Sequence, residues 1–294
     1  MTVAILGDSI SVGYSTSGLN DPTYRVTGEQ ITARINIPPY MPVWPKLVGE
    51  ALGRAFGYDG ITVVNCAVGG TNTSSDCLPD MIGRVVESDP DVVIIGFGMN
   101  EFWSPPAAHA QRLTRIIEQI SAAVPDAEYV LVSSMEPNLL AYDEKNIPLS
   151  EFEDEYFALR DKSADLHVAV APVNGVYTYA RETKGDFGLV GGNQNHPNDF
   201  AARLYAQTMA AVLGVYDAAS DGFYDDISPV SAETDRQGAE TRSDDTAAER
   251  DGDSGKNEKS RIIKALAFSG AAVLAVAAGC GAALGIANKK RKKE

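Results

Sequence analysis

The sequence predicts an α/β fold, a three-layer α/β/α sandwich built on a parallel sheet. Apolar, β-rich runs recur along residues 1–216, and segments with the apolar spacing of helices lie between them. Strands that alternate with helices form βαβ units, which place helices on both faces of a parallel sheet. The composition changes after residue 216, and we therefore expect residues 1–216 to form one domain.

Five apolar runs are the expected strands of this domain. They lie at residues 3–6, 61–68, 92–97, 129–133 and 168–173. Four sets of apolar residues at helical spacing mark the expected helices, each with one face toward the sheet. The sets are Leu47, Leu52 and Phe56; Leu113, Ile116, Ile117 and Ile120; Phe152, Tyr156 and Leu159; and Ala201, Leu204, Tyr205 and Met209.

The bulk composition excludes some classes of partner. The chain of 294 residues has a net charge of −15, and such an acidic body argues against binding to nucleic acid. The cysteines Cys66, Cys77 and Cys280 do not form a disulfide framework. Buried thiols are the favoured interpretation of Cys66 and Cys77, and a bridge between these two stays open.

Two further segments follow the domain. Residues 217–260 are acidic and poor in large apolar side chains, so we expect a disordered linker that buries too little surface to fold. Residues 261–294 contain an uncharged stretch at 265–287, which is long enough to span a bilayer, and a basic tail. The sequence therefore predicts a single-pass membrane protein with a C-terminal transmembrane helix.

The side of the membrane stays open between two alternatives. The basic tail favours a cytoplasmic C-terminus and an extracytoplasmic domain, although Lys259, Arg261 and Lys264 reduce the asymmetry of charge. Residues 1–8 already form the first strand and do not resemble a secretory signal. We expect either an extracytoplasmic domain whose upstream residues are missing from this chain, or a cytoplasmic domain with a C-terminal tail anchor.

Four short segments carry the candidate chemistry. Gly7-Asp8-Ser9 follows the first strand, residues 65–72 follow the second and contain a glycine pair, and residues 96–101 follow the third. Residues 193–199 lead into the last helix, with Asn198 or Asp199 as its N-cap. Open α/β sheets bind their ligands at the carboxyl ends of the strands, where these loops are expected to meet.

Acyl transfer from a serine needs a base, a group that orients the base, and donors for the oxyanion. Ser9 is the candidate nucleophile and His196 the candidate base. The backbone N–H groups of Ser9 and Gly70 and the side-chain amide of Asn100 are the candidate oxyanion donors. His196 has no second histidine or cysteine at ligand spacing, which argues against a metal site.

This arrangement resembles the SGNH hydrolases, also called the GDSL esterase/lipase family. Ser9, Gly70, Asn100 and His196 fall in order at the four positions that name the family, and the resemblance covers about residues 2–214. It implies a flavodoxin-like sheet, no metal or other cofactor, and hydrolysis of carboxylic esters or thioesters through an acyl-enzyme. Acyl lipids, acyl-CoA and O-acetylated glycans are the implied substrates. The chain lacks the Gly-x-Ser-x-Gly motif of the α/β-hydrolase elbow.

The sequence departs from this family three residues before the histidine, where Asn193 replaces the usual aspartate. An asparagine oxygen can accept a hydrogen bond from the imidazole, but it cannot stabilise the imidazolium by charge. In a serine protease, the same exchange lowers turnover by about 10⁴. We therefore expect a Ser–His dyad, with Asn193 or a backbone carbonyl as orienter, unless another carboxylate takes that place. Asp199 is expected to face elsewhere.

Two functions stay open from these residues. The first is a serine esterase that acts on O-acetylated glycans or acyl lipids. The second is a catalytically weak glycan-binding or scaffold module of the cell envelope, in which Asn193 records a loss of catalysis. The remaining histidines are expected to be structural, His109 at an exposed helix start and His167 at a strand start. The aromatic residues near the loops, Tyr14, Phe102 and Trp103, would line an acyl or sugar pocket or belong to the core.

Overall fold

The sheet is parallel and five-stranded. A computed structural model describes residues 1–17, 43–57, 60–138, 146–191 and 195–216. Its strands are β1 (Thr2–Gly7), β2 (Thr62–Asn65), β3 (Val92–Gly96), β4 (Glu128–Val132) and β5 (Val168–Ala171). They are arranged in the order β2-β1-β3-β4-β5, which is the flavodoxin-like order of doubly wound sheets. The five expected strands and the parallel sheet are confirmed.

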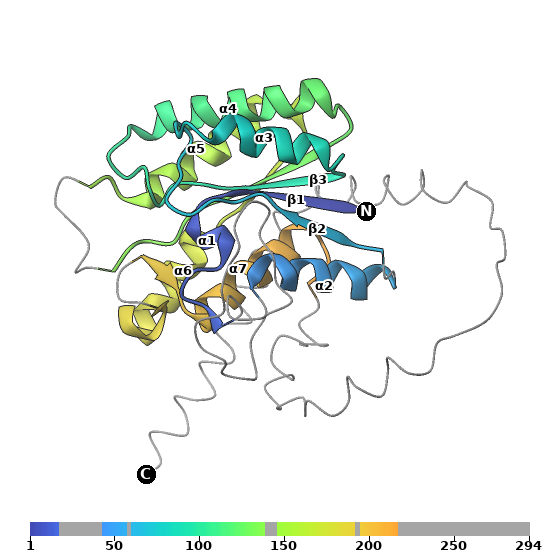
Figure 1. The fold of residues 1–294 in the computed structure, drawn as a ribbon. Helices are drawn as coiled ribbons and strands as arrows, with labels where there is room; N and C mark the ends of the chain where they lie inside the picture. Colours follow the sequence, from blue (N-terminus) through green and yellow to red (C-terminus); the bar gives the residue numbers. More distant parts are fainter. Residues whose placement is uncertain (18–42, 58–59, 139–145, 192–194, 217–294) are drawn as a thin grey trace, which may run out of the picture.

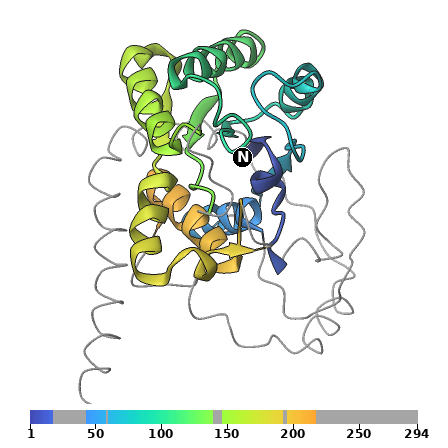
Figure 2. The same cartoon turned by 90° about the vertical axis from the view of Figure 1, so that its left-hand side faces the viewer.

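Helices cover both faces of this sheet, as the alternating pattern predicts. One face carries α3 (Leu78–Glu87), α4 (Pro106–Ala123) and α5 (Leu149–Lys162). The other carries α2 (Trp44–Phe56), α6 (Val173–Lys184) and α7 (Asp199–Val212), with the short α1 (Ser9–Val12) directly after β1 (Figure 1). Figure 2 shows the two groups of helices from the side, with the sheet between them.

The core explains why the strands are continuous apolar runs. Val3, Ala4, Ile5 and Leu6 of β1 are all fully buried, because helices cover both faces of the strand. The four sets of apolar helix residues are buried as expected, with one exception. Phe56 is 36 % exposed, since it is the last residue of α2 and Gly57 turns the chain away in the left-handed conformation.

Two of the expected strands end two or three residues earlier than predicted. β5 stops at Ala171, because Pro172 has no N–H to donate to a neighbouring strand, and Val173 begins α6. β2 stops at Asn65, but the chain continues beside β1, where Cys66 N–H donates to the carbonyl of Ile5 and Val68 N–H to that of Gly7. The helices α3 and α6 were not expected from the sequence.

The remaining expectations concern the segments after residue 216, the two cysteines of the domain, and His109. The linker at 217–260 and the segment at 265–287 lie outside the described residues. Among the helices that the structure does describe, none is long and apolar enough to cross a membrane. Cys66 and Cys77 are free thiols, so the alternative of a bridge between them is wrong. His109, expected at an exposed helix start, is fully buried.

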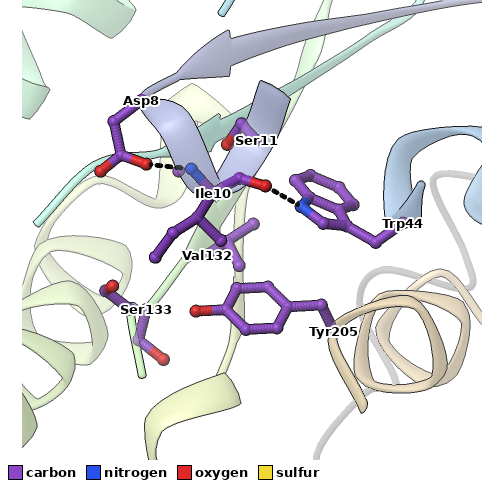
Figure 3. Close-up of a pocket in the computed structure, with 9 residues that line it drawn as sticks. Asp8, Ile10, Ser11, Trp44, Val132, Ser133 and Tyr205 are labelled. Atoms are coloured by element: carbon purple, nitrogen blue, oxygen red, sulfur yellow. Dashed lines mark hydrogen bonds between the residues drawn. The ribbon is translucent and has the colours of Figure 1, made fainter. Parts of the chain in front are cut away.

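Asp8 closes the turn between β1 and α1. Its Oδ1 accepts the backbone N–H of Ile10 at 2.9 Å, and the Ile10 carbonyl accepts the indole N–H of Trp44 at 3.0 Å (Figure 3). Asp8 also borders a small cavity that Ser133 and Tyr205 line from the other side. Burial raises the pKa of Asp8 to about 7, with a further contribution from the charge of Glu101. The carboxyl therefore remains largely protonated in the fold at mildly acidic pH.

We expect Asp8→Asn to be more stable than the wild type at pH 8. Unfolded Asp8 ionises near pH 3.8, whereas folded Asp8 keeps its proton until about pH 7, so the wild type loses stability as the pH rises between these values. The amide oxygen of asparagine still accepts the Ile10 N–H but carries no such penalty. The gain should reach about 4 kcal/mol at pH 8 and vanish near pH 4.

Urea unfolding followed by tryptophan fluorescence between pH 4 and 8 measures this difference. Asp8→Ala is the control, because it removes the cap and should destabilise by about 1 kcal/mol near pH 4. A difference between Asp8→Asn and the wild type that does not change with pH would contradict the prediction.

Candidate active site

Three loops meet at one edge of the sheet because β1 lies between β2 and β3. Ser9 begins α1 one residue after β1, the loop after β2 contains Gly70, and the loop after β3 contains Asn100. The chain leaves β1 toward β2 on one side and later returns to β3 on the other. This is the topological switch point at which doubly wound sheets place a ligand.

Ser9 and His196 are in direct contact, although 187 residues separate them. Ser9 Oγ lies 2.8 Å from Nε2 of His196. Ser9 is the first residue of α1 and is almost fully buried, and His196 belongs to the short strand β7 (His196–Pro197). The structure thus brings together the expected nucleophile and the expected base.

A small hairpin carries His196 to this position. β7 pairs antiparallel with β6 (Val190–Gly191), and Gly191 lies opposite His196. A Cβ at Gly191 would lie 2.5 Å from the carbonyl oxygen of Ser15, so the hairpin rests directly on the segment that follows α1. Only glycine allows this close approach of two backbones.

The start of α7 holds the same region from the other side. Asn198 is the N-cap, with its side chain accepting the N–H of Ala201 at 3.0 Å. Asp199 instead accepts the backbone N–H of Ser17 at 2.7 Å. Of the two N-cap candidates, Asn198 is confirmed. The carboxylate of Asp199 therefore bonds the segment after α1, and it has no contact with the imidazole of His196.

The surroundings of His196 suit a neutral imidazole. The ring is half-buried, with the ring of Tyr14 at a centroid distance of 5.8 Å, and burial lowers its pKa below 6.5. A hydroxyl proton of Ser9 directed at Nε2 leaves the ring proton on Nδ1. Among the described residues, the imidazole ring of His196 forms a hydrogen bond through Nε2 only. Asn193, the expected orienter, lies outside these residues.

The three expected oxyanion donors lie on the loops that meet at Ser9. Gly70 has a φ of +77°, and no heavy atom lies within 4 Å of the position that its Cβ would take. Within the described part of the chain, neither the Gly70 N–H nor the Ser9 N–H has an acceptor. Asn100 Nδ2 donates to the carbonyl of Thr71 at 2.9 Å, which leaves its second proton free for a ligand.

Two residues beside these donors were given no catalytic or positioning role from the sequence. Thr71 fixes the amide of Asn100 through its carbonyl, and its hydroxyl donates to the carbonyl of Val68 at 2.7 Å. The position of Thr71 directly after a glycine pair is the sequence feature that could have indicated it. Glu101, next to Asn100, is buried and paired with a histidine, which nothing in the spacing indicates. The described residues contain no group of three metal-binding side chains.

Solved structures with this fold include several esterases. A candidate GDSL-like lipase from Parabacteroides merdae is 15 % identical, with a TM-score of 0.56 over 73 % of this chain and 96 % of that one. An α/β hydrolase enzyme from the Lake Arreo metagenome is 16 % identical, with a TM-score of 0.56 over 74 % and 96 %. A catalytic mutant of Axe2, an acetylxylan esterase from Geobacillus stearothermophilus, is 15 % identical, with a TM-score of 0.53 over 71 % and 92 %.

These similarities at low identity establish the fold. A search of curated proteins gave no match. The model of the GDSL-like Lipase/Acylhydrolase family matches residues 5–204, which include Ser9, Gly70, Asn100 and His196. The chain therefore belongs to the GDSL-like Lipase/Acylhydrolase family and is a hydrolase of ester bonds.

Proposed function

We propose that residues 1–216 form a serine esterase in which Ser9 is the nucleophile and His196 the general base. The observation that carries this proposal is the distance of 2.8 Å between Ser9 Oγ and His196 Nε2, at the edge where the free donors meet. Nucleophile and base within hydrogen-bond distance are the geometric signature of an activated serine.

The reaction follows from these contacts. His196 Nε2 takes the hydroxyl proton as Ser9 Oγ attacks the acyl carbonyl, and the carbonyl oxygen becomes an oxyanion. The N–H groups of Ser9 and Gly70 and the amide of Asn100 stabilise that charge, each by about 3 kcal/mol. The imidazolium then protonates the leaving oxygen or sulfur as its bond to the acyl carbon breaks, so that an alcohol or thiol departs and an acyl-enzyme remains. Water repeats the sequence in reverse and releases the acid.

The orientation of His196 belongs to the same proposal. The tautomer with a proton on Nδ1 needs an acceptor there, and the side-chain oxygen of Asn193 is the one we propose. An amide fixes the tautomer without a charge, so the enzyme would work as a Ser–His dyad.

We propose O-acetylated glycans or acyl lipids as substrates. The presence of an acetylxylan esterase among the similar structures supports the first class. Trp103, three residues after Asn100, is 60 % exposed and packs edge-on against Phe102 at a centroid distance of 4.9 Å. An exposed indole suits stacking on a sugar ring. Comparing acetylated xylan with short-chain and long-chain p-nitrophenyl esters would distinguish the two classes.

We also propose that the domain is tethered to a membrane. The acidic composition of residues 217–260 suits a flexible linker, and the uncharged segment 265–287 with its basic tail suits a transmembrane helix. The extracytoplasmic orientation is the one that the basic tail favours, and a cytoplasmic tail anchor is its alternative. Protease accessibility of the linker in intact cells distinguishes the two orientations.

Ser9→Ala should abolish esterase activity. Loss of the nucleophile should lower kcat for p-nitrophenyl acetate by at least about 10³-fold. Ser11→Ala is the matched control. It removes another hydroxyl from the same short helix, and this hydroxyl does not contact His196. Equal rates for Ser9→Ala and the wild type would contradict the assignment of Ser9.

The pH profile should have its acidic limb below pH 6.5. Because His196 must be neutral to act as base and burial lowers its pKa, kcat/KM should stay high until the pH falls under the ordinary value for histidine. Initial rates on p-nitrophenyl acetate between pH 4.5 and 8 measure the limb. The Asp8→Asn variant should keep this acidic limb. If the limb disappears in the variant, ionisation of Asp8 and not of His196 causes it.

Asn193→Asp tests the dyad against the alternative of a weakened scaffold module. A carboxylate beside Nδ1 stabilises the imidazolium, so the acidic limb should move to higher pH. For a functional dyad we expect kcat to rise less than about 10-fold, well short of the roughly 10⁴ separating Asp from Asn in a serine protease. A gain near that full factor would instead support the scaffold module, in which Asn193 had impaired the catalytic site.

A further inference from the structure

One buried carboxylate joins the loops that carry Gly70 and Asn100. Glu101 is 2 % exposed, and its Oε1 accepts the backbone N–H of Thr73 at 3.2 Å as well as the Thr73 hydroxyl. Arg112 of α4 donates to the same oxygen at 3.1 Å. Glu101 Oε2 forms an ion pair with Nδ1 of His109, also on α4. The side chain thus bonds the loop after β2 and a helix at once.

These bonds lie beside the expected oxyanion donors. Glu101 follows Asn100 directly, and Thr73 is two residues beyond Thr71, whose carbonyl accepts the Asn100 amide. The loops after β2 and β3 are therefore bonded twice, by Asn100 to Thr71 and by Glu101 to Thr73. The N–H of Gly70 lies in the same short segment as Thr71.

His109 extends this connection to the other end of the loop after β3. Its Nε2 lies 2.8 Å from the hydroxyl of Tyr156 on α5, and that hydroxyl donates to the carbonyl of Phe97 at 3.0 Å. Phe97 immediately follows β3. A single histidine therefore holds the loop at Phe97 through Tyr156 and at Glu101 directly, with Asn100 between these two points.

The direction of the hydrogen bonds from Glu101 through His109 and Tyr156 to Phe97 follows from the protons that each group carries. The one hydroxyl proton of Tyr156 goes to Phe97, so its oxygen accepts from Nε2–H of His109. Burial alone would raise the pKa of Glu101, but the hydrogen bond and charge of His109, with Thr73 and Arg112, bring it below the ordinary value. The charge of Glu101 also raises the pKa of Asp8, which burial has already raised.

We propose that Glu101 and His109 are positioning residues for the oxyanion hole, holding Asn100 and the Gly70 loop at a fixed separation. This inference rests on the proposed role of Asn100 as an oxyanion donor. Donors stabilise a transition state well only if they are already in place, because moving them during the reaction consumes the stabilisation. Removing the bonds of Glu101 or His109 therefore lowers kcat. Binding of the substrate in its ground state, and with it KM, changes little.

Glu101→Ala in the full chain tests this proposal with p-nitrophenyl acetate. We expect kcat to fall by about 10- to 100-fold, the scale of a small misplacement of a catalytic group, with KM changed by less than about threefold. Glu101→Gln should rescue most of the loss, because its oxygen still accepts from Thr73. Glu136→Ala is the matched control. It removes another buried carboxylate, which accepts the Ser150 N–H at 2.9 Å and is not bonded to Thr73, Arg112 or His109.

A double-mutant cycle with Asn100→Ala separates positioning from stability. If Glu101 acts through Asn100, its removal should cost little further activity once Asn100 is absent. Fully additive losses, or a kcat of Glu101→Ala equal to the wild type, would overturn the inference. If Glu101→Ala does not fold, Tyr156→Phe replaces it, with a loss of several-fold in kcat that must likewise disappear in the Asn100→Ala background.

The two proposals fail in different ways. If Ser9→Ala or Asn100→Ala retains full activity, the proposed function itself is wrong. If both of these variants are impaired and Glu101→Ala is not, only the positioning role is wrong.

Discussion

The burial of β1 between β2 and β3 is the constraint on which the site depends. Hydrogen bonds on both edges and helices on both faces leave this strand no freedom of register, so the turn after Gly7 is held at a fixed place. Ser9, Gly70 and Asn100 come from three neighbouring strands, and parallel pairing brings the three strand ends to one edge. A nucleophile on a rigid strand end needs little reorganisation to react.

Two buried carboxyls close to this edge behave in opposite ways. Asp8 and Glu101 are both nearly inaccessible, at 1 % and 2 % exposure. Asp8 has a backbone N–H as its partner, and burial raises its pKa to about 7. Glu101 has an imidazole, a guanidinium and a threonine, and these lower its pKa in spite of burial. Partners rather than depth decide the charge, and the ionised Glu101 in turn favours the protonated form of Asp8.

The strand positions and the candidate residues could be predicted from local patterns. The apolar runs are long, and a strand that is buried on both faces has no polar alternation to confuse with a loop. Burial of single residues was harder to predict. His109 lies between two alanines near a helix start, where local pattern gives no sign of burial. Phe152 and Tyr156 from α5 pack against its ring and bury it. Pro172 was visible in the sequence, and it ended β5 where the apolar run alone predicted continuation.

The sequence by itself determined the α/β class, the five strands and the residue types that ester hydrolysis needs, because these depend on periodicity and chemistry within short segments. Only the tertiary structure decided that Ser9 and His196 are in contact, since hairpin β6–β7 and the start of α7 set that distance across 187 residues. The chain of contacts from Glu101 through His109 to Tyr156 was likewise decided by packing. Its members lie on different elements, and no local spacing encodes which buried charges will find one another.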